Sequence, residues 1–229
     1  FENSKASIIV GYKSKEVEKG IVSSKKLNFV NQSKQLGTAH AVKQSFPFLR
    51  KNSVSVVLYG DAPLVSKNTL NRLIKSASRG NLSLLTFIKD DPTGYGRIIR
   101  GAKNSVQKIT EHKDAKGSER EIKEVNSGIL AIKTDVLFKL MPSIKNNNAS
   151  KEYYLTDLVE IANKNSIAVN ASICDSYEVG GANNRQELHD LERQYQKRKG
   201  EALLDKGITI ADTSSCLLYT SDAADECDS

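Results

Sequence analysis

The chain has 229 residues, of which 38% are hydrophobic and 27% are charged, and it carries a formal net charge of +7. This length suits one large α/β domain or two small ones, and we favour one. Because no apolar run approaches the roughly 20 residues of a transmembrane helix, we expect no membrane partner. The lysines are scattered and no aromatic residues are interleaved with them, so the positive charge favours a solvated surface over nucleic-acid binding.

Cysteine usage and the amino terminus bear on where the protein works. Cys174, Cys216 and Cys227 lack the spacing of metal ligands, which favours a reduced, cytoplasmic environment. The chain begins at Phe1 without an initiating methionine or an apolar signal core. We therefore expect an amino-terminal truncation and no export.

Strand-like and helix-like patterns alternate along the chain. We expect strands at residues 7–12, 27–32, 53–58, 81–90, 97–99, 106–112, 125–132 and 167–174. We expect helices at residues 14–24, 38–46, 66–74, 134–141, 154–161 and 184–206, with Ser66 and Thr134 as caps. Charged residues 113–124 have no apolar period and indicate a mobile surface segment. The repeated strand-helix-strand units indicate an α/β fold with a mainly parallel sheet.

The apolar run Val54-Ser55-Val56-Val57-Leu58 ends abruptly at Tyr59-Gly60-Asp61. Its continuity predicts a central strand covered on both faces. In open α/β sheets, ligands bind at the carboxyl ends of strands, where a carboxylate such as Asp61 can hold Mg²⁺ against a phosphate. Alternatively, Asp61 is a turn residue whose side chain accepts hydrogen bonds from nearby backbone amides. Both interpretations stay open on this stretch alone.

Other polar residues and glycines stand at the ends of predicted elements. Gly37-Thr38 opens a helix whose first amides could meet an anion or a base, although such caps are common. Gly96 lies in a glycine loop that allows a ligand to approach the backbone, or simply forms a turn. Glu111 ends an antiparallel pair, and Asn126 interrupts a strand with an amide that can donate and accept hydrogen bonds. His40 is more typical of a packed helix residue than of a catalytic base.

Seven motifs occur together, in the order in which one known family has them. They are Gln35–Ala41, Tyr59–Leu64, Asp91–Ile98, Glu111–Asp114, Asn126–Ile129, Glu152–Asp157 and Gly181–Arg185. Through these motifs residues 7–211 resemble the uridylyltransferase half of the bacterial bifunctional N-acetylglucosamine-1-phosphate uridylyltransferase/glucosamine-1-phosphate acetyltransferase. Seven motifs in matching order are far more specific than any one of them.

The resemblance implies a Rossmann-like nucleotidyltransferase fold and a reaction that serves peptidoglycan and lipopolysaccharide synthesis. UTP and N-acetylglucosamine 1-phosphate would give UDP-N-acetylglucosamine and pyrophosphate with Mg²⁺. The catalytic Asp61 and Asn183 would bind the metal, which suits an ion that takes few protein ligands and completes its shell with phosphate and water. Substrate contacts would come from Gln32, Gly37 and Thr38 for uracil, Tyr59 and Gly60 for the nucleotide, and Gly96, Glu111, Asn126, Tyr154 and Thr156 for the amino sugar.

The chain departs from this family at both ends. It contains neither the family's first strand and glycine-rich phosphate loop nor its β-helix domain, through which full-length members form homotrimers. We therefore expect a truncated, inactive fragment. We expect a pyrophosphorylase-like domain at residues 1–183, a connector helix at 184–213 and a non-native tail at 214–229, which resembles a translated sequencing adapter. Another sugar-1-phosphate nucleotidyltransferase, or a non-catalytic nucleotide-sugar binding module, fits the same motifs.

Overall fold

The structure, a computed structural model, describes residues 4–22, 24–182 and 184–210. Its contacts divide the chain into two compact units. Unit 1 comprises residues 1–59 and 67–175, and unit 2 comprises residues 60–66 and 176–229. Asn183, the second predicted metal ligand, and the predicted non-native tail at 214–229 lie outside the described residues.

Unit 1 begins with a small parallel sheet of two strands, β1 (Ala6–Val10) and β2 (Leu27–Asn31). The sequence predicts both strands. The helix between them, α1 (Ser14–Gly20), has no buried residue and is shorter than the predicted 14–24, in agreement with its weak apolar pattern. The next helix, α2 (Thr38–Gln44), contacts β1 and buries Ala39 and Val42.

The larger sheet of unit 1 has six strands among the described residues. They are β3 (Val54–Val57), β4 (Leu82–Ile88), β5 (Arg97–Arg100), β6 (Val106–Thr110), β7 (Glu124–Lys133) and β8 (Val169–Ile173). The spatial order is β6-β5-β7-β4-β8, and β3 also pairs with β7. Because β4 pairs with both ends of β7, β3 and β5 share the other edge of this long strand.

Strand directions confirm an α/β fold with a mixed sheet. β4 and β8 are parallel, whereas β3, β4 and β5 each run antiparallel to β7, and β6 runs antiparallel to β5. Four of the six described strands therefore point the same way, although most neighbouring pairs are antiparallel. The unit from β3 through a helix to β4 does not place these two strands side by side, because β7 lies between them.

The central strand is β7, whereas the sequence predicts that the strand before Asp61 is central. Among the described strands β3 pairs only with β7, and its three valines are half-buried while Ser55 is buried. In β7 the four residues Ile129–Ile132 are all buried, so both faces of the strand are covered. Both strands have continuous apolar runs, so composition alone does not distinguish the central strand from its neighbour.

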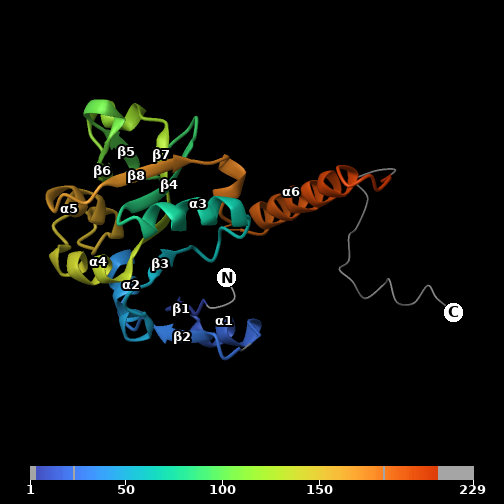
Figure 1. Cartoon of the computed structure of the whole chain (residues 1–229), viewed down its shortest axis with the longest axis horizontal. Coiled ribbons are helices and arrows are strands. Elements are labelled where there is room, and N and C mark those ends of the chain that lie inside the picture. Colours follow the sequence, from blue (N-terminus) through green and yellow to red (C-terminus); the bar gives the residue numbers. More distant parts are fainter. Residues whose placement is uncertain (1–3, 23, 183, 211–229) are drawn as a thin grey trace. The chain divides into compact units, whose positions relative to one another are not determined.

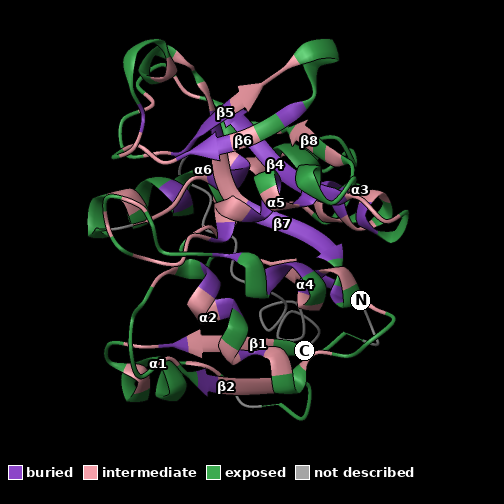
Figure 2. Ribbon diagram, turned by 90° about the vertical axis from the view of Figure 1, so that its left-hand side faces the viewer, coloured by how far each residue is buried: buried purple, intermediate pink, exposed green. Residues whose placement is uncertain are grey.

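Helices cover the two faces of the larger sheet (Figure 1). On one face α3 (Lys67–Ser78) packs against β4 and β7 and buries Leu73 and Ala77. On the other face α4 (Thr134–Leu140) and α5 (Leu158–Lys164) share a hydrophobic core with alternate strand residues such as Leu84 and Leu130. Figure 2 shows the burial that results along β7.

The start of α4 differs from the sequence prediction. The sequence predicts Thr134 as the cap, but Lys133 occupies the cap position and Thr134 is fully buried. The Thr134 hydroxyl instead shares hydrogen bonds with the hydroxyls of Ser53 and Ser55, at 2.9 and 2.8 Å. A buried threonine here joins the end of β7 to β3.

Charged residues 113–124 contain local structure that their composition does not predict. A 3-10 helix spans Gly117–Glu121, and Ala115 is buried. Glu119 forms an ion pair with Lys108 at 2.9 Å, and Arg120 donates a hydrogen bond to the Ala115 carbonyl at 2.9 Å. Further 3-10 turns occupy Phe46–Phe48, Ala102–Asn104, Met141–Ser143 and Leu155–Asp157.

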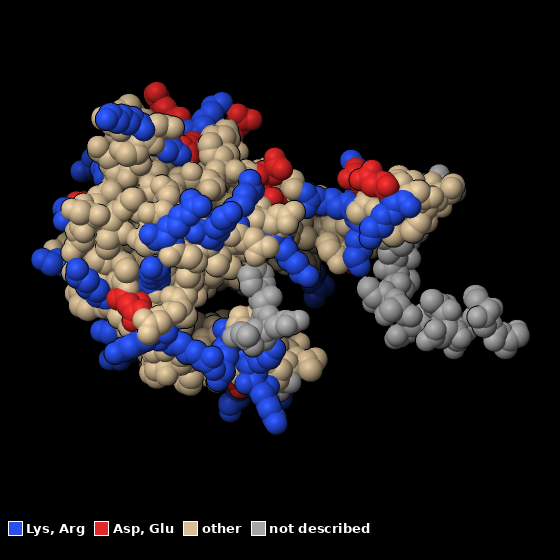
Figure 3. All heavy atoms as spheres, in the orientation of Figure 1, with Lys and Arg blue, Asp and Glu red and all other residues tan. Residues whose placement is uncertain are grey.

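Basic side chains are spread over the face of the molecule that Figure 3 draws, with acidic side chains among them. Exposed ion pairs such as Lys164–Glu160, at 2.6 Å, occur on this kind of surface and contribute little stability. This distribution agrees with the solvated, lysine-rich surface that the sequence indicates.

Unit 2 contains a 3-10 turn (Ser176–Val179) and the helix α6 (Arg185–Leu204). The predicted charged helix at 184–206 is confirmed. Asn184 caps it by accepting a hydrogen bond from the Glu187 amide at 2.9 Å. No helix in the described part of the chain has both the length and the apolar character needed to cross a membrane.

Candidate active site

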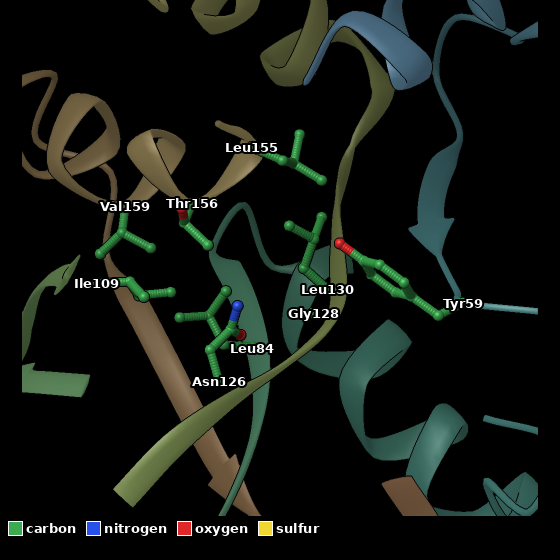
Figure 4. A pocket seen from close by; sticks show the side chains of 9 residues that line it. All are labelled: Tyr59, Leu84, Ile109, Asn126, Gly128, Leu130, Leu155, Thr156 and Val159. Carbon is green, nitrogen blue, oxygen red and sulfur yellow. The ribbon is translucent and has the colours of Figure 1, made fainter. Parts of the chain in front are cut away.

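A hollow in unit 1 opens where β4, β6 and β7 meet the segment before α5 (Figure 4). Its lining is formed by Tyr59, Leu84, Ile109, Asn126, Gly128, Leu130, Leu155, Thr156 and Val159. Small-molecule sites usually combine an apolar wall of this kind with a few placed polar groups. Three of the lining residues, Tyr59, Asn126 and Thr156, are substrate contacts that the resemblance implies, and the fold brings them together from distant parts of the chain.

Asn126 reaches the hollow through an irregularity in β7. Thr86 of β4 pairs with Asn126 and Leu84 pairs with Leu130, so Leu85 alone faces the three residues of β7 that lie between these pairs. Bulges of this kind bend a strand and re-aim its side chains, and they are common beside active sites. The polar interruption visible in the sequence at Asn126 is therefore the start of a β-bulge.

Tyr59 packs its ring against Gly128 at a position that requires glycine. Gly128 has a φ of +83°, which lies in the left-handed region that other residues rarely adopt. A Cβ atom on this residue would overlap the Tyr59 ring. Because Gly128 has no side chain, the ring rests directly on the bulge, and Figure 4 shows its hydroxyl end directed towards the hollow. The sequence pattern does not single out Gly128.

Glu111, Thr156 and Gly96 form one polar group. The Thr156 hydroxyl donates to the Glu111 carboxylate at 2.8 Å, and a Cβ on Gly96 would lie 3.2 Å from Glu111 Oε2. The Gly96 carbonyl accepts a hydrogen bond from the backbone N–H of Asn126 at 2.8 Å. Burial raises the pKa of Glu111, and Asp114 adds to this rise, against the hydrogen bond from Thr156 that favours the carboxylate. The structure thus brings together four of the five residues implied for the amino sugar.

The fifth residue, Tyr154, stands in the segment before α5, close to a carboxyl group that sequence reasoning missed. Burial raises the pKa of Tyr154 above its ordinary value. Burial also raises the pKa of Asp157 to about 6, and the charges of Glu160, Glu111 and Asp114 add to the rise. Asp157 ends a motif that carries the resemblance, but its raised pKa depends on burial and on charges that include Glu111 and Asp114, which lie far away in the sequence.

Gln32, Gly37 and Thr38 form a second cluster at the start of α2. The Gln32 side-chain amide lies 3.2 Å from the Gly37 carbonyl and 3.0 Å from His40 Nδ1, which supports a packing role for His40. Gly37, at φ +109°, lies so close to the Tyr153 backbone that a Cβ would be 2.6 Å from the Tyr153 carbonyl oxygen. This contact explains why the position requires glycine.

The sequence predicts that Thr38 caps its helix, but the structure does not show this. The cap position belongs to Gly37, and the Thr38 hydroxyl accepts a hydrogen bond from the Leu155 amide at 2.9 Å. The Ala39 amide donates to the Tyr153 carbonyl at 2.9 Å, so this first-turn amide has a partner within the protein. The start of α2 and the segment before α5 are therefore joined by main-chain and side-chain hydrogen bonds.

Unit 2 carries Gly60 and Asp61. Asp61 is exposed, and its backbone carbonyl accepts a hydrogen bond from the Ala182 amide at 3.1 Å. A Cβ on Gly181 would lie 3.3 Å from Asp61 Oδ2, so the carboxylate faces a backbone without a side chain. The turn that precedes Asn183 thus folds onto Asp61.

The surroundings of the Asp61 carboxylate bear on whether it can bind Mg²⁺. No group of three or more His, Cys, Asp and Glu side chains in the described residues could hold a metal ion. Mg²⁺ does not need such a group, because it is commonly held by one or two carboxylates together with substrate phosphates and water. An exposed carboxylate beside a glycine backbone fits a site of this open kind.

Glu178 is a buried carboxyl group of unit 2 that sequence reasoning did not select. It is 6% exposed and accepts a hydrogen bond from the Ser66 amide at 2.9 Å. Ser66 ends the segment 60–66 that contains Asp61. Residues 178–182 therefore contact this segment at both of its ends, through Glu178 and through Ala182.

Comparison with known proteins identifies the class of protein to which this chain belongs. Residues 3–180 match the nucleotidyl transferase family, and the chain belongs to it. The Bifunctional protein GlmU of Pseudomonas fluorescens is 45% identical over 206 residues, which are 90% of this chain and 45% of that protein. The protein of the same name from Francisella philomiragia is 42% identical over 208 residues, covering 90% of this chain and 46% of that protein.

The chain thus spans about half the length of the curated relatives it matches. The resemblance based on seven motifs is confirmed by these relatives. A solved structure, "The Crystal Structure of UDP-glucose pyrophosphorylase complexed with UDP-glucose", superposes with a TM-score of 0.65 at 13% identity. The match covers 85% of this chain and 81% of that one, and it confirms the fold. The roles of the individual site residues remain predictions.

Proposed function

We propose that this chain is the uridylyltransferase portion of an enzyme that makes UDP-N-acetylglucosamine and pyrophosphate from UTP and N-acetylglucosamine 1-phosphate. The observation that carries this proposal is the hollow of unit 1, where Asn126 and Thr156 lie beside an apolar wall. Glu111 is hydrogen-bonded to Thr156, and Gly96 to the Asn126 backbone. The 45% identity to proteins named Bifunctional protein GlmU supports this substrate. The UDP-glucose complex of similar fold supports a uridine diphosphate sugar as the ligand class.

In this proposal the unit 1 hollow binds the amino sugar. Asn126 supplies an amide that donates and accepts, and the Glu111 carboxylate accepts hydrogen bonds from the sugar's hydroxyl or amide groups. Thr156 orients Glu111 through the bond between them. Tyr154 and Gly96 complete the sugar contacts, and the aliphatic wall excludes water from the ring.

The nucleotide contacts follow the same assignment. Gln32, Gly37 and Thr38 recognise uracil, and Tyr59 and Gly60 lie against the nucleotide. Asp61, with Asn183, would hold Mg²⁺, whose charge when bound offsets the negative charge of the phosphates. The exposed Asp61 carboxylate and the adjoining glycine backbone support this assignment.

The reaction is a nucleotidyl transfer. A phosphate oxygen of N-acetylglucosamine 1-phosphate forms a bond to the α-phosphorus of UTP, and the bond from that phosphorus to the bridging oxygen breaks as pyrophosphate leaves. Such transfers depend mainly on positioning and on stabilisation of charge, so the protein groups need not form a covalent intermediate. We place the reaction in the cytoplasm, as a supply of precursors for the cell wall. By the resemblance, a full-length protein with the β-helix domain would be a homotrimer.

Calorimetric titration tests the proposal. With Mg²⁺ present, the chain should bind UDP-N-acetylglucosamine at least about tenfold more tightly than dTDP-glucose or GDP-mannose, because a site built to hydrogen-bond one ligand penalises others. Chelation of Mg²⁺ and the variant Asp61→Asn should each weaken binding. Equal affinity for the three nucleotide sugars would overturn the proposal, and a preference for dTDP-glucose or GDP-mannose would favour another sugar-1-phosphate nucleotidyltransferase.

A further inference from the structure

The bulge of β7 interrupts the regular pairing between β4 and β7. Leu85 faces the three residues 127–129, although a regular ladder places one residue opposite one. Leu85 and Ile129 are both fully buried, so water cannot satisfy their polar backbone groups. A buried donor or acceptor without a partner destabilises the fold, so a bulge at this depth requires another source of hydrogen bonds.

Ser127 supplies these hydrogen bonds from within the bulge. Its hydroxyl donates to the Leu85 carbonyl at 2.6 Å and accepts from the Ile129 amide at 3.1 Å. A hydroxyl has one donor and two acceptor positions, so it can make both bonds at once. One side chain thus bonds to the backbone of both strands at the bulge.

The residues on either side of Ser127 are the ones that the bulge presents to the hollow. Asn126 lines the hollow, and Gly128 supports the ring of Tyr59. Ser127 itself is not among the residues that line the hollow. Its hydroxyl therefore fixes the backbone that carries two parts of the site without touching a ligand there.

We propose that Ser127 is a positioning residue for sugar binding: its hydroxyl locks the bulge of β7, which directs Asn126 into the hollow and supports Tyr59 on Gly128. The identity of the sugar ligand rests on the proposed function. The locking of the bulge by Ser127 does not, because the hydrogen bonds to Leu85 and Ile129 involve residues of this chain alone.

Two variants of equal shape isolate the hydroxyl. Ser127→Thr keeps it, whereas Ser127→Val has the same branched shape and cannot make either bond. The readout is the ratio of the affinities for UDP-N-acetylglucosamine and UDP, measured by calorimetry with Mg²⁺, because this ratio reports the sugar's own contribution. Ser127→Val should lower the ratio roughly tenfold, and Ser127→Thr should keep it within about twofold of the wild type.

A double-mutant cycle with Asn126→Ala tests whether Ser127 acts through Asn126. Ser127→Val should cost little further affinity for the sugar once Asn126 has lost its amide, because coupled residues are non-additive. Additive losses, or an equal ratio in the Thr and Val variants, would overturn the positioning role. A wild-type ratio near one would instead contradict the proposed function.

Amide hydrogen exchange tests, without any ligand, whether the Ser127 hydroxyl holds the bulge of β7. The Ile129 amide should exchange at least about tenfold faster in Ser127→Val than in Ser127→Thr, because only the second variant retains its acceptor. Amides of α3 should exchange equally in the two variants if the effect is local. Equal protection of the Ile129 amide in the two variants would show that the hydroxyl does not hold the bulge.

Discussion

The half-buried carboxyl group of Asp157 links the candidate site to pH. Burial, together with the charges of Glu160, Glu111 and Asp114, raises its pKa from the ordinary 3.8 to about 6. A carboxyl group with a raised pKa favours the folded state while it is neutral. Its contribution to stability is therefore fully present below pH 3.8 and is lost as the pH rises through about 6.

Asp157→Asn removes this ionisation and should stabilise the protein at neutral pH. We expect a gain of about 1 kcal/mol in the free energy of unfolding at pH 7.5, after allowance for solvent screening, and almost none near pH 4. Urea unfolding at the two pH values measures the gain, and Asp175→Asn, at an exposed position of unit 1, is the matched control. The same gain at both pH values would contradict the assigned cause.

Gly128 and Gly94 provide a matched test of the Tyr59 contact. Both glycines have positive φ, +83° and +85°, but only Gly128 has the Tyr59 ring where a Cβ would lie, and Gly94 has open space. Gly94→Ala should cost about 1 kcal/mol of stability from the backbone alone. Gly128→Ala should cost about 3 kcal/mol, because overlap with the ring adds to the same strain. Equal losses in urea unfolding would mean that the ring does not rest on Gly128.

Single residues were predictable from the sequence when their chemistry was local. Asn126 is visible as a polar residue in an apolar strand, and Glu111 as a carboxylate at the end of an antiparallel pair. The role of Gly128 depends on a bulge, which exists only relative to the partner strand β4. The raised pKa of Asp157 likewise depends on residues that the fold brings near.

One buried hydroxyl contributes to the contact between β3 and the start of α4. Thr134 is fully buried and shares hydrogen bonds with Ser53 and Ser55. Thr134→Val keeps the shape but leaves serine hydroxyls without this partner, so stability should fall by about 1–2 kcal/mol. In the double variant with Ser55→Ala, part of the stability should be regained, because the Ser55 hydroxyl that lost its partner is removed as well. A full additive loss in urea unfolding would contradict this account.

Elements were predictable where periodicity is local, and their arrangement was not. The strands at 7–12, 27–32 and 167–174 appear as β1, β2 and β8, each shorter than predicted, and β1 begins one residue earlier, at Ala6. The apolar runs of β3 and β7 look alike in sequence, yet β7 is central because it is long enough to pair with β4, β3 and β5. Partner choice depends on contacts between distant segments, which no local pattern contains.

At the scale of the whole molecule, the seven motifs indicate the family from the amino-acid sequence alone. The match to the nucleotidyl transferase family over residues 3–180 confirms that indication. No sequence pattern indicates that residues 60–66, with Asp61, belong to the same compact unit as residues 176–229. The Glu178–Ser66 and Ala182–Asp61 hydrogen bonds join these segments, which lie far apart in the chain.

The most direct test of the central claim is amide chemical-shift mapping of the full chain with Mg²⁺, comparing UDP-N-acetylglucosamine with UDP. If the unit 1 hollow binds the amino sugar, the amides of Gly96, Asn126, Gly128 and Thr156 should shift with the nucleotide sugar well beyond their shifts with UDP. Asn126, Gly128 and Thr156 line the hollow, and Gly96 is hydrogen-bonded to the Asn126 backbone, so these amides report the sugar itself. Identical shifts with the two ligands, or sugar-dependent shifts confined to other residues, would contradict the account.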